Sequence, residues 1–224
     1  MKETLIKALV IFRKDALNEL RTKEIIASVL VFAILVLLIF SFAFDPSSGT
    51  TEIVAPGILW VCFTFAGVLG LNRVFSAERD NSNMDGLKLC PVERSVIYLG
   101  KFFSSFVFML TIEVIITPIF LVLFNLPLFE PELILIIVLA TIGFASVGTL
   151  FSALSMNTRA RDILVPILFL PVVVPVVIGG VESTALALGG RTIGDMSTWL
   201  QIIVACDIIY LVASILIFDF VIED

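Results

Sequence analysis

Six long apolar runs alternate with shorter polar stretches along this 224-residue chain. The runs occupy residues 25–44, 53–71, 102–124, 133–154, 163–181 and 199–222. Each has about the 20 residues that an α-helix needs to cross a hydrocarbon core about 30 Å thick. The runs are continuous rather than alternating, which favours helices over the strands of a barrel. The pattern predicts one transmembrane domain, residues 1–224, in an all-α integral membrane protein with six spans.

The segment before the first run, residues 1–23, is too polar to span a membrane but has a helical period. The apolar positions share one face of the predicted helix: Leu5, Leu9, Phe12, Ala16 and Leu20. The opposite face carries the polar positions Lys7, Lys14, Asn18 and Arg21. Such a pattern is typical of an amphipathic helix in the membrane interface, and a helix packed on a partner would share it.

The longest polar stretch, ERDNSNMDGLKLCPVERSVIYLGK at residues 78–101, separates the second and third runs. A short helix here would place Met84 and Leu87 one turn apart on one face, and Pro91 would end it. Gly100–Lys101 would then mark the return into the membrane. An apolar knob with charged flanks suits a groove of a cytoplasmic partner, but a solvated loop fits the same residues.

The fifth run carries three prolines, Pro166, Pro171 and Pro175, each of which removes a backbone donor from a helix. They predict a bent or interrupted helix, either near a moving interface or simply bent. The polar stretch after it, residues 182–198, is predicted to be a loop, and its TALAL segment a short surface or re-entrant helix.

Lysine and arginine are distributed unevenly between the two sides of the predicted bundle. The segments before the first run, between the second and third runs, and between the fourth and fifth runs hold thirteen of the 14 basic residues. The other side holds only Arg191. Because basic residues are retained on the cytoplasmic side, both termini are predicted to lie in the cytoplasm. The membrane that the chain spans is predicted to be the cytoplasmic (inner) membrane.

Composition narrows the function further. Hydrophobic residues make up 59% of the chain and charged residues 15%, against about 45–50% and about 25% in soluble domains. The chain has no histidine, and Cys62, Cys90 and Cys206 lie far apart, so no metal site or catalytic Ser–His arrangement is predicted. It also lacks a GxxxxGK[ST] phosphate loop and a basic, aromatic patch for nucleic acid.

Two carboxyl groups fall inside predicted spans, Glu113 in the third and Asp207 in the sixth. A charge at the bilayer centre costs roughly 2.5–3.5 kcal/mol on insertion scales, so such groups face the bundle interior, find partners or stay protonated. They could line a substrate path or contact another subunit. Alternatively, each could simply bond to a neighbouring helix, for example through Thr111 or Thr117.

Several segments resemble known families. The polar stretch 78–101 resembles the loop between the second and third spans of type-2 ABC exporter permeases, with a charged start, a Leu-rich turn, a proline and a final Gly-Lys. Residues 12–46, 54–78 and 159–180 resemble the CcmB family, the membrane subunit of the cytochrome c maturation haem exporter. APGILW followed by NRVFSAE is the most specific element. The resemblance covers nearly the whole chain in order.

This resemblance implies an assembly. Two permease copies would pair with two CcmA-type ATPase subunits, and CcmC- and CcmD-type membrane subunits would complete the complex. In such exporters a coupling helix between spans two and three docks on the ATPase. Carried across, that role falls on Glu78, Asp80, Met84, Asp85, Leu87, Leu89 and Pro91. A second ATPase contact would fall on Arg159 and Arg161.

The resemblance also implies a non-catalytic chain that binds no cofactor of its own. Haem is the implied substrate, and ATP is bound and hydrolysed by the partner subunit. ATP use could drive haem export or release a haem-loaded chaperone. The alternative is a type-2 ABC exporter permease for a lipid, a polysaccharide or a drug.

Overall fold

The computed structural model is all-helical in the residues it describes, which are 2–22, 24–44, 50–71, 93–127, 131–155 and 161–221. Seven helices occupy these ranges: α1 (Lys2–Thr22), α2 (Glu24–Ala43), α3 (Thr50–Leu71), α6 (Arg94–Leu123), α7 (Pro131–Ser155), α8 (Arg161–Leu188) and α9 (Ile193–Val221). All but α1 are long and apolar enough to cross a membrane. The predicted number of spans is therefore confirmed.

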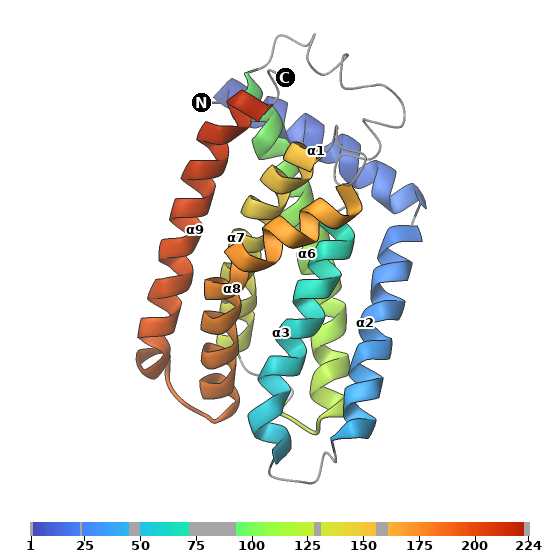
Figure 1. Cartoon of the computed structure of the whole chain (residues 1–224), viewed down its shortest axis with the longest axis vertical. Helices are drawn as coiled ribbons and strands as arrows, with labels where there is room; N and C mark the ends of the chain where they lie inside the picture. Colours follow the sequence, from blue (N-terminus) through green and yellow to red (C-terminus); the bar gives the residue numbers. More distant parts are fainter. Residues whose placement is uncertain are drawn as a thin grey trace.

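The six long helices run side by side along the long axis of the molecule, and α1 lies across one end (Figure 1). Both ends of the chain lie at that same end (Figure 1). The turn between α6 and α7 and the turn between α8 and α9 lie at the opposite end (Figure 1). This arrangement follows from an even number of spans, which returns the chain to the side on which it starts.

Helix α7 lies at the centre of the bundle because its residues are small on several faces. It packs against α3, α6, α8 and α9, and most of its residues are buried. Gly143 lies against Asp207 of α9, and Gly148 against Leu71 at the end of α3. Small residues let helix backbones approach closely in a membrane, where tight packing replaces the hydrophobic effect as the source of association.

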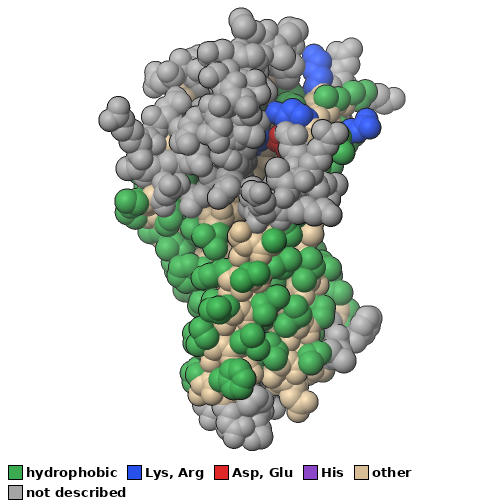
Figure 2. Space-filling model, turned by 90° about the vertical axis from the view of Figure 1, so that its right-hand side faces the viewer, with side chains coloured by type: hydrophobic (Ala, Val, Ile, Leu, Met, Phe, Trp, Pro, Cys, Tyr) green, Lys and Arg blue, Asp and Glu red, His purple; other side chains and the backbone are tan. Residues whose placement is uncertain are grey.

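The outer helices expose apolar side chains along their length. Exposed positions on α2 and α9 include Val31, Leu35, Ile39, Phe42, Ile208, Ile209, Val212, Leu216 and Phe220. On the face seen in Figure 2, the described Lys and Arg side chains gather at one end, and hydrophobic side chains cover the length of the bundle. An apolar surface of this extent is stable in lipid but not in water.

Helix α8 is continuous through its three prolines. Pro166, Pro171 and Pro175 all lie inside the helix that runs from Arg161 to Leu188. The helix is visibly bent in Figure 1, as expected where proline removes a backbone donor and crowds the preceding turn. Of the two predicted forms, a bent helix is therefore confirmed over an interrupted one.

The predicted outer loop at 182–198 is wrong. Residues Glu182 to Leu188, including TALAL, continue α8 rather than forming a separate surface or re-entrant helix. The helix ends at two glycines, where Gly190 has φ 70° and the Arg191 N–H donates to the Leu186 carbonyl. Glycine tolerates this left-handed conformation, so it stops a helix that the sequence before it would continue.

Helix α9 also begins earlier than predicted, at Ile193. The Asp195 carboxylate accepts hydrogen bonds from the backbone N–H and the hydroxyl of Thr192, each at 3.0 Å. This contact resembles a capping box, in which the third helical residue reaches back to the residue before the helix. The connection between α8 and α9 is therefore only residues 189–192.

Candidate functional site

Helix α1 crosses the first turns of α6 at a point of close backbone approach. A Cβ atom added at Gly100 would lie 2.8 Å from the Ile11 Cβ and 3.1 Å from the Ala8 carbonyl oxygen. Only glycine fits this contact without displacement. Gly100–Lys101 was predicted to mark the return into the membrane, but α6 begins at Arg94, so both residues lie within the helix, where α1 packs on it.

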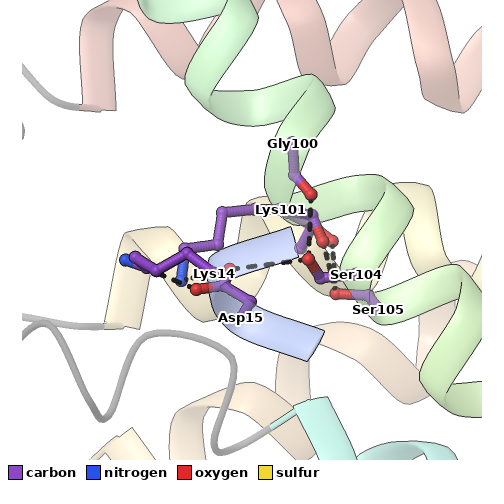
Figure 3. A network of polar contacts seen from close by, with 7 residues as sticks. Lys14, Asp15, Gly100, Lys101, Ser104 and Ser105 are labelled. Carbon is purple, nitrogen blue, oxygen red and sulfur yellow. Dashed lines mark hydrogen bonds and ion pairs between the residues drawn. The ribbon is translucent and has the colours of Figure 1, made fainter. Parts of the chain in front are cut away.

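The α1–α6 junction contains a buried ion pair. The Lys101 Nζ lies 2.9 Å from the Asp15 Oδ2, and the Lys101 side chain is only 1% exposed and that of Asp15 15% exposed. The Ser104 hydroxyl donates to the same Oδ2 at 3.5 Å, and Lys14 Nζ lies 3.4 Å from Oδ1 (Figure 3). A lysine so deeply buried needs a carboxylate beside it, since an unpaired charge out of water is very costly.

Helix α1 has three different faces around its axis. Ala8, Ile11 and Asp15 form the face that packs on α6. The outward apolar side chains are exposed: Ile6, Leu9, Val10 and Leu17. Lys7 and Lys14 form a basic edge between these two faces. The predicted apolar face is therefore divided, because Leu9 is exposed while Phe12 and Ala16 are half-buried toward the bundle.

Glu113 is buried between α6 and α7. Its Oε2 accepts a hydrogen bond from the Thr141 hydroxyl at 2.6 Å. The two suggested partners are wrong: Thr111 donates to the Val107 carbonyl and Thr117 to the Glu113 carbonyl, both within α6. Within a helix, a threonine hydroxyl tends to bond the backbone carbonyl four residues before it. The partner of the Glu113 carboxyl group therefore comes from the neighbouring helix.

Asp207 is buried in α9, where it faces Gly143 of α7. A Cβ atom at Gly143 would lie 2.5 Å from the Asp207 Oδ1, so the carboxyl group occupies the space that the glycine leaves. Neither carboxyl oxygen has a hydrogen-bond partner among the described residues, although both are shielded from solvent. The expected face toward the bundle interior is confirmed for Asp207 and for Glu113.

The structure places these two carboxyl groups on different sides of α7. Their contacts on α7, Thr141 and Gly143, are two residues apart. Two residues turn an α-helix by about 200° and advance it by about 3 Å. Glu113 and Asp207 therefore lie at nearly the same depth with α7 between them. A cooperating acid and base would have to approach each other directly, and these do not.

A small hollow lies beside Glu113, between α3 and α6. Its lining residues are Phe63, Ala66, Gly67, Met109, Ile112 and Glu113. Its volume is about 10 Å³, which is room for about one water molecule. The hollow therefore cannot admit a porphyrin. The described residues also contain no group of three or more His, Cys, Asp or Glu side chains placed to hold a metal ion.

The residues predicted to contact an ATPase fall where the structure describes little. Glu78, Asp80, Met84, Asp85, Leu87, Leu89 and Pro91 lie outside the described residues, as does Arg159. Arg161 is the first residue of α8. These assignments stay predictions.

The contact between Asp15 and Lys101 was not predicted from the sequence. Both were visible as charges, but Lys101 counted only toward the positive side of the bundle. A usable signal was present: Asp15 lies on neither the predicted apolar face nor the basic face of the N-terminal helix. Two features together indicate a buried contact. One is a carboxylate that lies apart from the basic face, and the other is a lysine that follows a glycine inside a helix.

Other polar contacts at this end of the bundle were also missed. The Arg94 guanidinium donates to the Asp219 carbonyl at 2.7 Å, joining the start of α6 to the end of α9. The Ser152 hydroxyl donates to the Leu71 carbonyl at 2.7 Å, which satisfies an acceptor at the end of α3. Such bonds between distant residues leave no periodic trace in the sequence.

Comparison with known proteins gives consistent results. A family model described as CcmB protein matches residues 6–223. The chain is 27% identical to Heme exporter protein B of Pseudomonas aeruginosa, over 80% of this chain and 81% of that protein. It is 28% identical to Heme exporter protein B of Rhodobacter capsulatus, over 68% and 71% of the two chains. For the Paracoccus denitrificans protein of that name, identity is 27% over 72% and 74%.

Proposed function

This chain belongs to the CcmB family, and we propose that it is the membrane permease subunit of a haem exporter in cytochrome c biogenesis. The observation that carries the proposal is the family match over residues 6–223 of a chain with six helices suited to cross a membrane. The described helices supply an apolar belt and a packed interior rather than a reaction centre. Haem is the substrate, and a partner subunit hydrolyses ATP.

Deletion of the gene for this chain tests the function directly. We expect the deletion strain to lose covalently haem-bound c-type cytochrome and to recover it when the intact chain is supplied from a plasmid. Haem-stained gels of membrane and periplasmic fractions measure the effect. Normal levels of haem-bound cytochrome in the deletion strain would overturn the proposal.

The predicted coupling segment, residues 78–91, is proposed to dock on a CcmA-type ATPase, with CcmC- and CcmD-type subunits and a second permease copy in the complex. Leu87 is the central apolar position of that segment. We expect Leu87→Asp to abolish stimulation of the ATPase while the chain still inserts in the membrane. Leu87→Met is the matched control and should keep the stimulation, because it keeps an apolar side chain of similar size.

The proposed orientation places both termini and α1 at the cytoplasmic face, with α1 in the membrane interface. Support comes from the basic residues, from the shared end of the two termini in Figure 1 and from the exposed apolar face of α1. A membrane-impermeant thiol reagent should label Cys90 in inside-out vesicles but not in intact spheroplasts. Cys90→Ser gives the background from the other two thiols, Cys62, which is buried, and Cys206, which is partly buried. Labelling from outside would reverse the orientation.

A further inference from the structure

We propose that Asp15 and Lys101 are positioning residues that make α1 and the first turns of α6 a single moving unit, which is required for stimulation of the partner ATPase. The inference rests on the proposed function, because it concerns how movement passes from the ATPase into the permease. It assigns a role to α1 beyond attachment to the membrane surface. It also assigns a role to a buried lysine that no span needs for crossing lipid.

The contact between α1 and α6 is close and directional. At Gly100 the two helices approach until a single added methyl group would overlap Ile11. One turn along, the Lys101–Asp15 ion pair closes the junction at 2.9 Å, with Ser104 on the same carboxylate oxygen (Figure 3). An apolar contact alone can slide, whereas an ion pair in a poorly hydrated site fixes one register between two helices.

The α1–α6 junction also lies shortly after the predicted coupling segment in the sequence. Residues 72–92, which contain the predicted coupling segment, precede α6 along the chain, and Lys101 is the eighth residue of that helix. At the start of α6, Arg94 donates to the Asp219 carbonyl near the end of α9. Any displacement of the chain before Arg94 therefore pulls on α6, and through Lys101 on α1.

The faces of α1 that point away from α6 are suited to hold this helix in the membrane interface. Ile6, Leu9, Val10 and Leu17 are exposed apolar side chains, and Lys7 lies on the basic edge. A helix of this kind resists leaving the interface, because its apolar face prefers lipid and its basic edge prefers anionic headgroups and water. Because α1 is joined to α6 and stays in the interface, it restrains the start of α6 when the rest of α6 moves.

The test compares variants in the complete complex purified with its ATPase. Asp15→Asn removes the carboxylate that lies against the buried Lys101, and we expect it to lose most of the ATPase stimulation per assembled complex. The charge swap, Asp15→Lys with Lys101→Asp, should recover a substantial part of it. Asp207→Asn, the same change at a buried aspartate of α9 outside the junction, is the matched control and should behave as the native chain does.

A second pair of changes separates positioning from simple stability. Asp15→Leu with Lys101→Met removes both charges and keeps the junction apolar, a replacement that often preserves stability. We expect this variant to assemble in normal amount yet to show weakened ATPase stimulation, because the register between the helices is no longer fixed. Normal stimulation per complex in this variant would overturn the inference, since packing alone would then suffice.

The remaining outcomes also decide between the two proposals. If the native chain captures no ATPase, the proposed coupling and this inference both fail. If the native complex is stimulated and Asp15→Asn is stimulated equally per complex, only the inference fails, whatever the amount of protein recovered. Should the charge swap recover assembly but no stimulation, a role for the pair in positioning is likewise excluded.

Discussion

Two regions of this protein bury charged side chains in opposite ways. At the α1–α6 junction, Lys101 is 1% exposed and lies 2.9 Å from the Asp15 carboxylate. Around α7, Glu113 accepts one hydroxyl bond, and Asp207 has no hydrogen-bond partner among the described residues. The first region joins two helices through opposite charges. The second fills gaps in a helix bundle with acidic side chains that form no ion pair with any cation of the described residues.

This difference indicates which buried side chains the stability of the fold depends on most. A buried ion pair stabilises little as a whole, but loss of one partner exposes the full cost of the other buried charge. A buried carboxyl group that pairs with no cation leaves no such charge behind when it is neutralised. The same aspartate-to-asparagine change should therefore have very different effects in the two regions, and the following predictions are ordered by their expected size.

Asp15→Asn should give the largest loss. It replaces the carboxylate beside the buried Lys101 ammonium group with a neutral amide, and we expect the free energy of unfolding to fall by about 3–5 kcal/mol. Unfolding by a graded denaturing detergent in mild-detergent micelles measures the change. A loss below that of Asp207→Asn would contradict the conclusion that stability depends more on the ion pair than on the buried carboxyl groups beside α7.

Gly100→Ala should give the next largest loss, about 1–3 kcal/mol, because the new methyl group would overlap Ile11 and approach the Ala8 carbonyl. The same unfolding assay applies. Gly57→Ala is the control, since nothing lies within 4 Å of a Cβ atom at that position. Equal behaviour of the two variants would show that α1 does not pack closely on α6.

Thr141→Val should cost about 0.6 kcal/mol, with about 1.7 kcal/mol as the upper end for hydrogen bonds between membrane helices. Valine keeps the shape of threonine but removes the hydroxyl that donates to Glu113. Thr111→Val, whose hydroxyl bonds only within its own helix, is the control. A double-mutant cycle with Glu113→Met, which removes the acceptor oxygen, isolates the contact between the two side chains, and a coupling energy of zero would contradict it.

Asp207→Asn should have the smallest effect, less than about 1 kcal/mol, because the two side chains have nearly the same shape and no hydrogen bond to a described residue is lost. Stability and covalent haem attachment should both stay near native values. A loss as large as that of Asp15→Asn would reveal a charged partner for Asp207 in the assembled complex and would remove the contrast on which these predictions rest.

Much of the fold could be predicted because lipid imposes a strong local rule. Apolar stretches long enough to cross the bilayer must be helical, so six spans and the N-terminal helix appear in the sequence itself. Helix ends were predicted less well. Helix α8 runs through Gly179 and Gly180 and continues to Leu188, and it ends only where Gly190 takes a left-handed conformation, although the polar residues Glu182 to Thr184 suggested a loop.

The candidate site was harder to predict because its contacts join distant parts of the chain. From hydropathy alone, Glu113 and Asp207 could be predicted to face the bundle interior, since a lone carboxyl group avoids lipid. The packing of the helices was needed to show that the Thr141 hydroxyl, 28 residues away, bonds Glu113. It was also needed to show that Asp15 contacts Ser104, 89 residues away, and Lys101 on the same helix as Ser104. Hydropathy reports the solvent that each residue prefers, whereas the partner of a buried polar group depends on how the helices pack, which no local pattern records.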